Sequence, residues 1–87
     1  MIIKFSKHSI IQMLARGADE NEVISAILDG NWDIAKYDKL QCRKTFLFKN
    51  RSPMNNQFYK YKTIEPIFVK ENSEIIVITI KVYYHDK

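Results

Sequence analysis

Residues that build disulfides, metal sites and phosphate-binding loops are scarce in this chain. Its 87 residues include two glycines, two histidines and one cysteine, Cys42. A single cysteine excludes an intrachain disulfide and fits a reducing cytosol, where we expect Cys42 to be a small core residue. Two histidines and one cysteine do not supply the four ligands of a structural zinc site, and two glycines do not build a glycine-rich phosphate loop. We therefore expect a cytoplasmic protein with no metal and no cofactor.

Long apolar runs are also absent. The most apolar stretch, Ile75–Ile78, is far too short to span a bilayer. The N-terminal residues MIIKFSKH lack the apolar stretch and the small-residue cleavage site of a signal peptide. The chain is 46% hydrophobic, which is enough for a folded core, and its length fits one domain over residues 1–87. We expect no membrane among its partners.

Charge is present in two blocks of opposite sign. Residues 19–35 contain five acids and no base, whereas residues 36–70 contain nine bases and two acids, a net charge of +7. Such blocks predict a basic surface that faces a polyanion and a separate acidic surface. The alternative is an ordinary solvated basic face.

Two short helices are expected near the N-terminus. Ser6 can cap the first with its hydroxyl and Gly17 can end it in a left-handed conformation, which bounds a helix over residues 6–16. A capping-box pattern then begins at Asp19 and opens a second helix over residues 20–29. Apolar residues recur at helical spacing in both segments.

Strand-forming residues dominate the rest of the chain. Strands are expected over residues 32–37, 42–49, 58–64, 67–70 and 74–86, with a polar loop over 50–57 and a turn over 71–73. Pro66 cannot donate to a ladder, so it marks a bend or a sheet edge. Helices first and strands after predict an α+β fold, with two N-terminal helices packed on one face of a three- to four-stranded antiparallel sheet.

In the last predicted strand, the two sets of alternate residues differ in polarity. One set of alternate residues is purely apolar and should lie against the helices: Ile76, Ile78, Ile80 and Val82. The other set turns polar toward its end, at Lys81, Tyr83 and His85. The sheet is therefore expected to have one face covered by helices and one open face.

The opening stretch FSKHSIIQMLARGADENEVISAILDG resembles the start of a widespread family of small prokaryotic proteins that share a domain of unknown function. The matching residues are Phe5, Ser6, His8, Met13, Arg16, Gly17, Val23 and Gly30. The end of the chain is also similar, through Thr79 and Tyr83 or Tyr84, and the resemblance covers about two thirds of the chain. Relatives often have an arginine where this chain has Gln12.

That family is similar to the BrnT-like and RelE-like toxins, whose compact fold also occurs in barnase-type ribonucleases. The resemblance implies a RelE- or barnase-like arrangement of helices on one face of an antiparallel sheet. It also implies metal-independent RNA cleavage by the toxin of a toxin–antitoxin pair. The implied partners are RNA, free or on the ribosome, and a small antitoxin such as a helix-turn-helix protein.

Metal-free RNA cleavage needs a base for the 2′-OH proton, cations for the phosphate and an acid for the leaving 5′-oxygen. The candidate catalytic residues are His8, Arg16, Arg43 and His85, because histidine titrates near neutral pH and arginine can bond two phosphate oxygens. The candidate RNA-binding residues are Lys44, Lys60, Lys62, Lys81, Tyr59, Tyr61 and Tyr83. On a helix, His8, Gln12 and Arg16 would share a sector of about 80°.

Each candidate also has a structural interpretation. His8 could make a structural hydrogen bond only, Arg16 could be a helix-end cation, and His85 could lie in a frayed tail. The tyrosines favour strands in any case. Two functions therefore remain: a ribonuclease toxin, and a non-catalytic module that holds RNA or a protein partner on the same basic and aromatic sheet.

Overall fold

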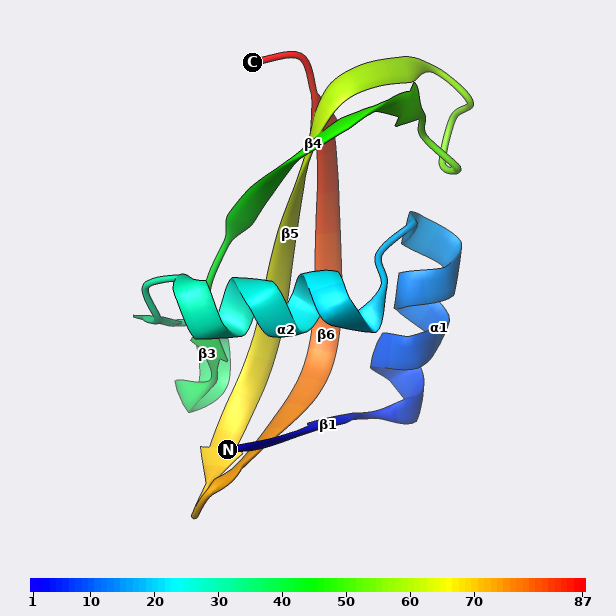
Figure 1. The fold of residues 1–87 in the computed structure, drawn as a ribbon. Helices are drawn as coiled ribbons and strands as arrows, with labels where there is room; N and C mark the ends of the chain where they lie inside the picture. The colour runs from blue at the N-terminus through cyan, green and yellow to red at the C-terminus, as the bar shows by residue number, and fades with distance from the viewer.

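The computed structural model describes residues 1–87 as two α-helices packed on one face of a six-stranded sheet (Figure 1). In chain order the elements are β1 (Ile2–Phe5), α1 (Lys7–Arg16), α2 (Glu20–Asp29), β2 (Asp33–Ile34), the 3-10 helix η1 (Lys36–Asp38), β3 (Leu40–Gln41), β4 (Lys44–Arg51), β5 (Phe58–Glu71) and β6 (Glu74–His85). The predicted α+β class is confirmed. The sheet has more strands than expected because β1, β2 and β3 have only four or two residues, too few to leave a clear period.

The two helices begin and end where their capping residues predict. The Ser6 hydroxyl accepts a hydrogen bond from Ser9 N–H (3.1 Å), and Gly17 adopts a left-handed conformation with φ 82°. Asp19 and Glu22 form a complete capping box at the start of α2. Gly17 admits no side chain, since a Cβ there would collide with the Tyr84 hydroxyl and with Pro53.

The strands follow the order β1-β6-β5-β3-β2, and β4 pairs with β5 alongside β3. All pairings are antiparallel except that of β1 with β6. Figure 1 shows α2 crossing the face of the long β5–β6 hairpin, with α1 beside β6. The strand predicted over residues 32–37 is wrong beyond Ile34, because the chain turns there through η1 and returns as β3.

Pro66 lies inside β5, which runs without a break from Phe58 to Glu71. The edge expected at Pro66 is present locally, because β3 pairs with β5 at Ile67 and Phe68, β4 pairs with it only as far as Ile64, and neither pairs with Pro66. The Pro66 carbonyl accepts a hydrogen bond (3.4 Å) from Cys42 N–H in the link between β3 and β4. The N and C=O of one residue point to the same side of a strand. The Pro66 nitrogen, which has no hydrogen to donate, therefore points to the side of β5 where the β3–β4 link lies. A gap in the neighbouring ladder thus accommodates the proline.

A β-bulge in β6 changes which of its residues face the helices. Ile67 pairs with Thr79 and Phe68 pairs with Val77, so Ile78 is an extra residue. A one-residue insertion exchanges the two faces of a strand. The buried residues of β6 are accordingly Ile75, Val77, Ile80 and Val82. The predicted apolar set is correct after the bulge and wrong before it.

The core lies between the helices and the sheet face beneath them, which we call the covered face; its opposite is the open face. The core residues are Met13, Val23, Ala26, Ile27, Cys42, Ile64, Phe68, Ile75, Val77, Ile80 and Val82. Trp32 packs edge-on against Phe68 with ring centroids 5.1 Å apart. Cys42 is 3% exposed and its thiol donates to the Ala26 carbonyl, which confirms it as a core residue. Neither helix is long and apolar enough to cross a membrane.

Candidate functional site

A buried carboxylate lies at the centre of the open face. Glu65 is 3% exposed, and its two oxygens accept hydrogen bonds from Arg43 Nε and from the Tyr83 hydroxyl (3.3 Å). The guanidinium of Arg43 lies 5.6 Å from the centroid of the Tyr83 ring. The hydrogen bond and charge of Glu65 raise the pKa of Arg43. The pKa of Tyr83 is raised by burial and then by Glu65. Strand alternation in β5 and β6 aims these side chains away from the helices.

His85 belongs to the same face, two residues beyond Tyr83 in β6. Its Nε2 lies 2.7 Å from the hydroxyl of Thr63, which in turn lies 2.8 Å from the hydroxyl of Thr45. Its Nδ1 bonds to the Lys87 carbonyl, and its ring stacks on Tyr61 with centroids 5.9 Å apart. The imidazole is therefore held through both nitrogens and one face. A frayed tail is the wrong description, because β6 extends through His85.

Two hollows connect these groups to solvent. One, of about 470 Å³, is lined by Arg43, Thr63, Tyr83 and His85. The other, of about 500 Å³, is lined by Asn31, Asp33, Gln41, Cys42, Arg43 and Glu65. Because Arg43 belongs to both, a carboxylate, a guanidinium and an imidazole border one continuous surface. These groups can accept a proton, stabilise an anion and donate a proton, respectively.

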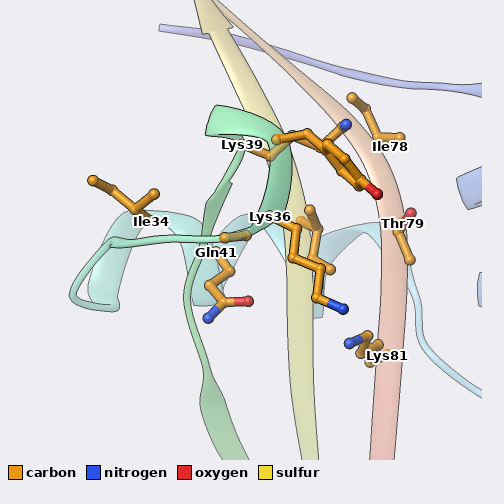
Figure 2. Close-up of a pocket in the computed structure, with 10 residues that line it drawn as sticks. Ile34, Lys36, Lys39, Gln41, Ile78, Thr79 and Lys81 are labelled. Atoms are coloured by element: carbon orange, nitrogen blue, oxygen red, sulfur yellow. The ribbon is translucent and has the colours of Figure 1, made fainter.

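A third hollow, of about 720 Å³, continues the surface on the other side of Gln41. Its walls come from the segment around η1 and from the open faces of β5 and β6. Figure 2 shows Lys36 and Lys39 on the η1 side and Lys81 on β6. The open face thus carries three adjoining hollows, from His85 at one end to η1 at the other.

The predicted stripe of His8, Gln12 and Arg16 does not join this site. β1 ends at Phe5, opposite Val77, which leaves the next part of the β6 edge without a strand partner. Gln12 accepts a hydrogen bond from Ile80 N–H (2.8 Å), and Arg16 donates to the Ile80 carbonyl (2.7 Å). These two side chains therefore complete the backbone hydrogen bonding of an edge strand.

His8 is exposed in the first turn of α1 and makes no side-chain hydrogen bond. The apolar stripe expected on this helix is largely exposed as well: Ile10 is 43% and Leu14 81% exposed. The helix packs on β6 through Met13 and through the polar bonds of Gln12 and Arg16. A catalytic role for His8 therefore stays a prediction, without support from the groups around it.

Two lysines predicted to bind RNA point to the helices instead. Lys62 Nζ donates to the Gly17 carbonyl and forms an ion pair with Glu22, both at 2.8 Å. Lys44 Nζ donates to Ser25 (2.6 Å) and pairs with Asp29 at 2.5 Å, which lowers the pKa of the Asp29 carboxyl. The acidic and basic blocks of the sequence therefore meet across the covered face. The prediction of two separate charged surfaces is wrong at these positions.

The remaining candidates divide between the open face and the far end of the sheet. Lys60 and Lys81 are exposed, and Tyr61 stacks on His85. The Tyr59 ring lies 5.8 Å from that of Tyr84, whose hydroxyl donates to the Arg16 carbonyl. Tyr59 therefore packs with the covered side. Sequence reasoning missed Glu65, although an acid within a basic, apolar strand could have drawn attention to it.

Comparisons with protein-family models, curated proteins and solved structures found no match. The resemblance to RelE-like toxins stays a prediction from the sequence motifs. The function must be inferred from the geometry of the open face.

Proposed function

We propose that this protein is a metal-independent ribonuclease, the toxin of a toxin–antitoxin pair, which cleaves RNA by attack of a 2′-OH on the adjacent phosphate. One observation supports the proposal above all others. The buried carboxylate of Glu65 and the imidazole of His85 flank Tyr83 on the open face, with Arg43 bordering both hollows. These are the chemical groups that the reaction requires, and they gather where the helices leave the sheet uncovered.

Each group has a role that its surroundings favour. Glu65 takes the proton from the 2′-OH, and Arg43 stabilises the negative charge that develops on the phosphate. His85, as the imidazolium, gives the proton of Nε2 to the leaving 5′-oxygen; the Thr63 hydroxyl positions Nε2, and Nδ1–H bonds to the Lys87 carbonyl. The P–O5′ bond breaks as the O2′–P bond forms. The products are a 2′,3′-cyclic phosphate and a 5′-hydroxyl.

RNA would lie along the open face. The exposed cation Lys81 and the residue Tyr83, 42% exposed, are available there to its phosphates and unpaired bases, and the exposed Lys60 lies at the far end of the sheet. Binding should weaken steeply as salt rises, because each neutralised phosphate releases counterions. The proposed antitoxin is a small cytoplasmic protein whose acidic segment covers this face and keeps RNA away from it.

The test is a cleavage assay with the purified protein, free of any partner, with and without ribosomes. Cleavage is expected in the presence of a chelator, with a 2′,3′-cyclic phosphate at the new end. His85→Gln should lower the rate by about 10²–10⁴, because an amide cannot donate a proton as an imidazolium does. His8→Gln tests the sequence-based role of His8 separately: it should cleave like the parent, because His8 is not part of the open face, and loss of cleavage would restore that role. An inactive parent under both conditions would overturn the proposal, and a fully active His85→Gln would remove His85 from it.

The second candidate is a non-catalytic module that binds RNA or a protein. It is favoured by the bonding of Glu65, both of whose oxygens already have partners in Arg43 and Tyr83. A purely structural ion pair would have the same geometry. Salt-sensitive RNA binding by the parent, without cleavage under any of the conditions above, would select this function.

A further inference from the structure

The 720 Å³ hollow beside the proposed reaction site has an unusual wall. Tyr37 and Asp38, in η1, both have φ near 59°, a conformation that costs energy for residues other than glycine. This turn leaves Tyr37 87% exposed at the hollow, with Lys39 Nζ 5.4 Å from the centroid of its ring. A large aromatic ring is thus held in water at an energetic cost, instead of being packed.

The opposite wall is formed by the open face of the central hairpin. Ile67 contributes from β5, and Ile78 and Thr79 contribute from the bulge in β6. The bulge puts both Ile78 and Thr79 on the open face, since regular alternation from the buried Val77 would have turned Thr79 to the covered face. Bulges are common beside functional sites because they redirect a side chain in this way. The result is a small aliphatic floor opposite the Tyr37 side.

The charge of the hollow is entirely positive. Lys36, Lys39 and Lys81 line it, no acidic residue does, and none of the three lysines forms a salt bridge. Lys36 and Lys81 approach from opposite walls in Figure 2. The amide of Gln41 adds a hydrogen-bonding group. The volume of about 720 Å³ falls within the range of about 300–1,000 Å³ that is usual for small-ligand pockets.

We infer that this hollow binds one unpaired nucleotide of a single-stranded RNA, with the base on Tyr37 and the aliphatic floor and a phosphate between Lys36 and Lys81. Aromatic rings and aliphatic surfaces hold unpaired bases by stacking, and lysines hold phosphates as point charges. The inference rests on the proposed ribonuclease function, for which it names a substrate-binding subsite.

Continuity with the reaction site supports a nucleotide over a free anion. Lys81 is the direct cross-strand partner of Glu65, which puts their Cβ atoms about 5 Å apart. Gln41 borders both this hollow and the one that contains Glu65 and Arg43. A nucleotide held beside Lys81 would therefore place the neighbouring phosphate of the same strand at Arg43.

Binding can be measured separately from cleavage. Single-stranded DNA has no 2′-OH and cannot undergo the proposed reaction, so a short oligodeoxynucleotide serves as one probe. The four nucleoside 3′-monophosphates and inorganic phosphate are the others. Titration of the ¹⁵N-labelled protein is expected to shift the amide signals of Lys36–Gln41 and Thr79–Lys81 with every nucleotide probe. Inorganic phosphate should bind at least tenfold more weakly than the nucleotides, because it lacks a base to stack.

Three variants test the named contacts. Tyr37→Asn keeps a residue that tolerates the left-handed conformation and removes the ring, and it should weaken oligonucleotide binding about tenfold. Lys36→Ala should weaken it about fivefold, the effect of one solvated charge contact. Lys70→Ala removes an exposed lysine of β5 that does not line the hollow, and it should leave the affinity unchanged.

The outcomes separate this inference from the proposed function. Nucleotide-dependent shifts in the hollow without any RNA cleavage would support the subsite and count against the ribonuclease. Cleavage by a protein whose hollow shows no shifts, or whose Tyr37→Asn variant binds like the parent, would overturn the subsite alone. Equal affinities for inorganic phosphate and the nucleotides would also overturn it, since a base would then contribute nothing.

Discussion

The two faces of the sheet use the same residue types in opposite ways. On the covered face Lys62 pairs with a carboxylate of α2 and donates to the carbonyl of the residue that caps α1. Lys44 pairs with another carboxylate of α2, and Arg16 donates to a backbone carbonyl at the edge of β6. On the open face Lys81 has no ion-pair partner, and Arg43 is bonded to Glu65 while two-thirds of its side chain stays exposed. A basic residue count therefore overstates the charge that a ligand would meet. The accessible charge depends on which face a strand position occupies.

The difference also explains why one face could perform chemistry. The charged groups of the covered face bond to the helices and to the residues that cap them, so replacing them should reduce stability. Polar groups on the open face border hollows of about 470–720 Å³, so replacing them should alter binding or cleavage. The following substitutions, from the largest expected effect to the smallest, would sharpen or break this contrast.

The two bonded carboxylates, Glu65 and Glu22, give the sharpest comparison. Glu65→Gln removes the proposed base, so RNA cleavage should fall by about 10²–10⁴. Glu22→Gln breaks the ion pair with Lys62 on the covered face, so it should lower the unfolding temperature and leave cleavage below that temperature intact. Rates measured on folded samples, with folding checked by circular dichroism, decide the matter. Equal loss of cleavage in both variants would mean that the open face has no special role.

The lysines Lys62 and Lys60, two residues apart in β5, test the ion pair of the covered face through stability. The Lys62 side chain is 10% and its partner Glu22 18% exposed, so Lys62→Met leaves a largely buried carboxylate without its cation. This should lower the free energy of unfolding by about 3 kcal/mol, within the range for broken buried pairs. Lys60→Met, at an exposed neighbouring position, should change it by less than about 0.5 kcal/mol. Urea denaturation measures both; similar values for the two variants would contradict the assignment.

The fold class could be predicted from the sequence because its signals are local. Ser6, Gly17 and the Asp19–Glu22 capping box mark helix ends within four residues of chain, and both helices were located correctly. Which residues of β6 face the helices could be predicted only for the part of the strand after the bulge. The bulge at Ile78 depends on its register with β5, which no local pattern encodes. The short strands β2 and β3 exist only through pairing with each other and with β5.

The candidate site was predicted in part for the same reason. Arg43, Lys81, Tyr83 and His85 were named from residue type, and the structure brings them to one face with Glu65. Lys44 and Lys62 were assigned to RNA because composition does not reveal that α2 packs over them. The sequence correctly places Arg16 and Gln12 on one stripe of the helix. That stripe bonds to unpaired backbone groups at the edge of β6, and the position of this edge follows from the sheet topology, which no local pattern encodes.

That strand edge gives the next prediction. Gln12→Ala leaves the Ile80 N–H without its partner, which should lower the free energy of unfolding by about 1–3 kcal/mol. His8→Ala, one turn earlier at an exposed position, should change it by less than about 0.5 kcal/mol. Amide hydrogen exchange at Ile80 should accelerate in Gln12→Ala alone. A stable Gln12→Ala with a protected Ile80 amide would show that the edge is satisfied in another way.

The smallest expected effect concerns Cys42, in the core under α2. Burial, with a smaller contribution from the charge of Glu65, raises the pKa of the Cys42 thiol to about 11, from 9.0. Between these pH values the unfolded chain has lost the thiol proton and the folded protein still holds it. The unfolded state therefore binds fewer protons, and the free energy of unfolding should fall as pH rises through this interval.

The raised pKa values of Tyr83 and Tyr84 act in the same direction, above their ordinary value of 10.0. The contribution of the cysteine therefore begins at a lower pH than that of the tyrosines, and comparison with a variant that lacks the thiol separates the two. Cys42→Ala should be less stable than the parent at pH 7, because it loses packing and the bond to the Ala26 carbonyl, yet its stability should be flatter from pH 9 to 10. Parallel pH profiles of the two proteins in that window would show that the thiol is not shielded from water in the folded state.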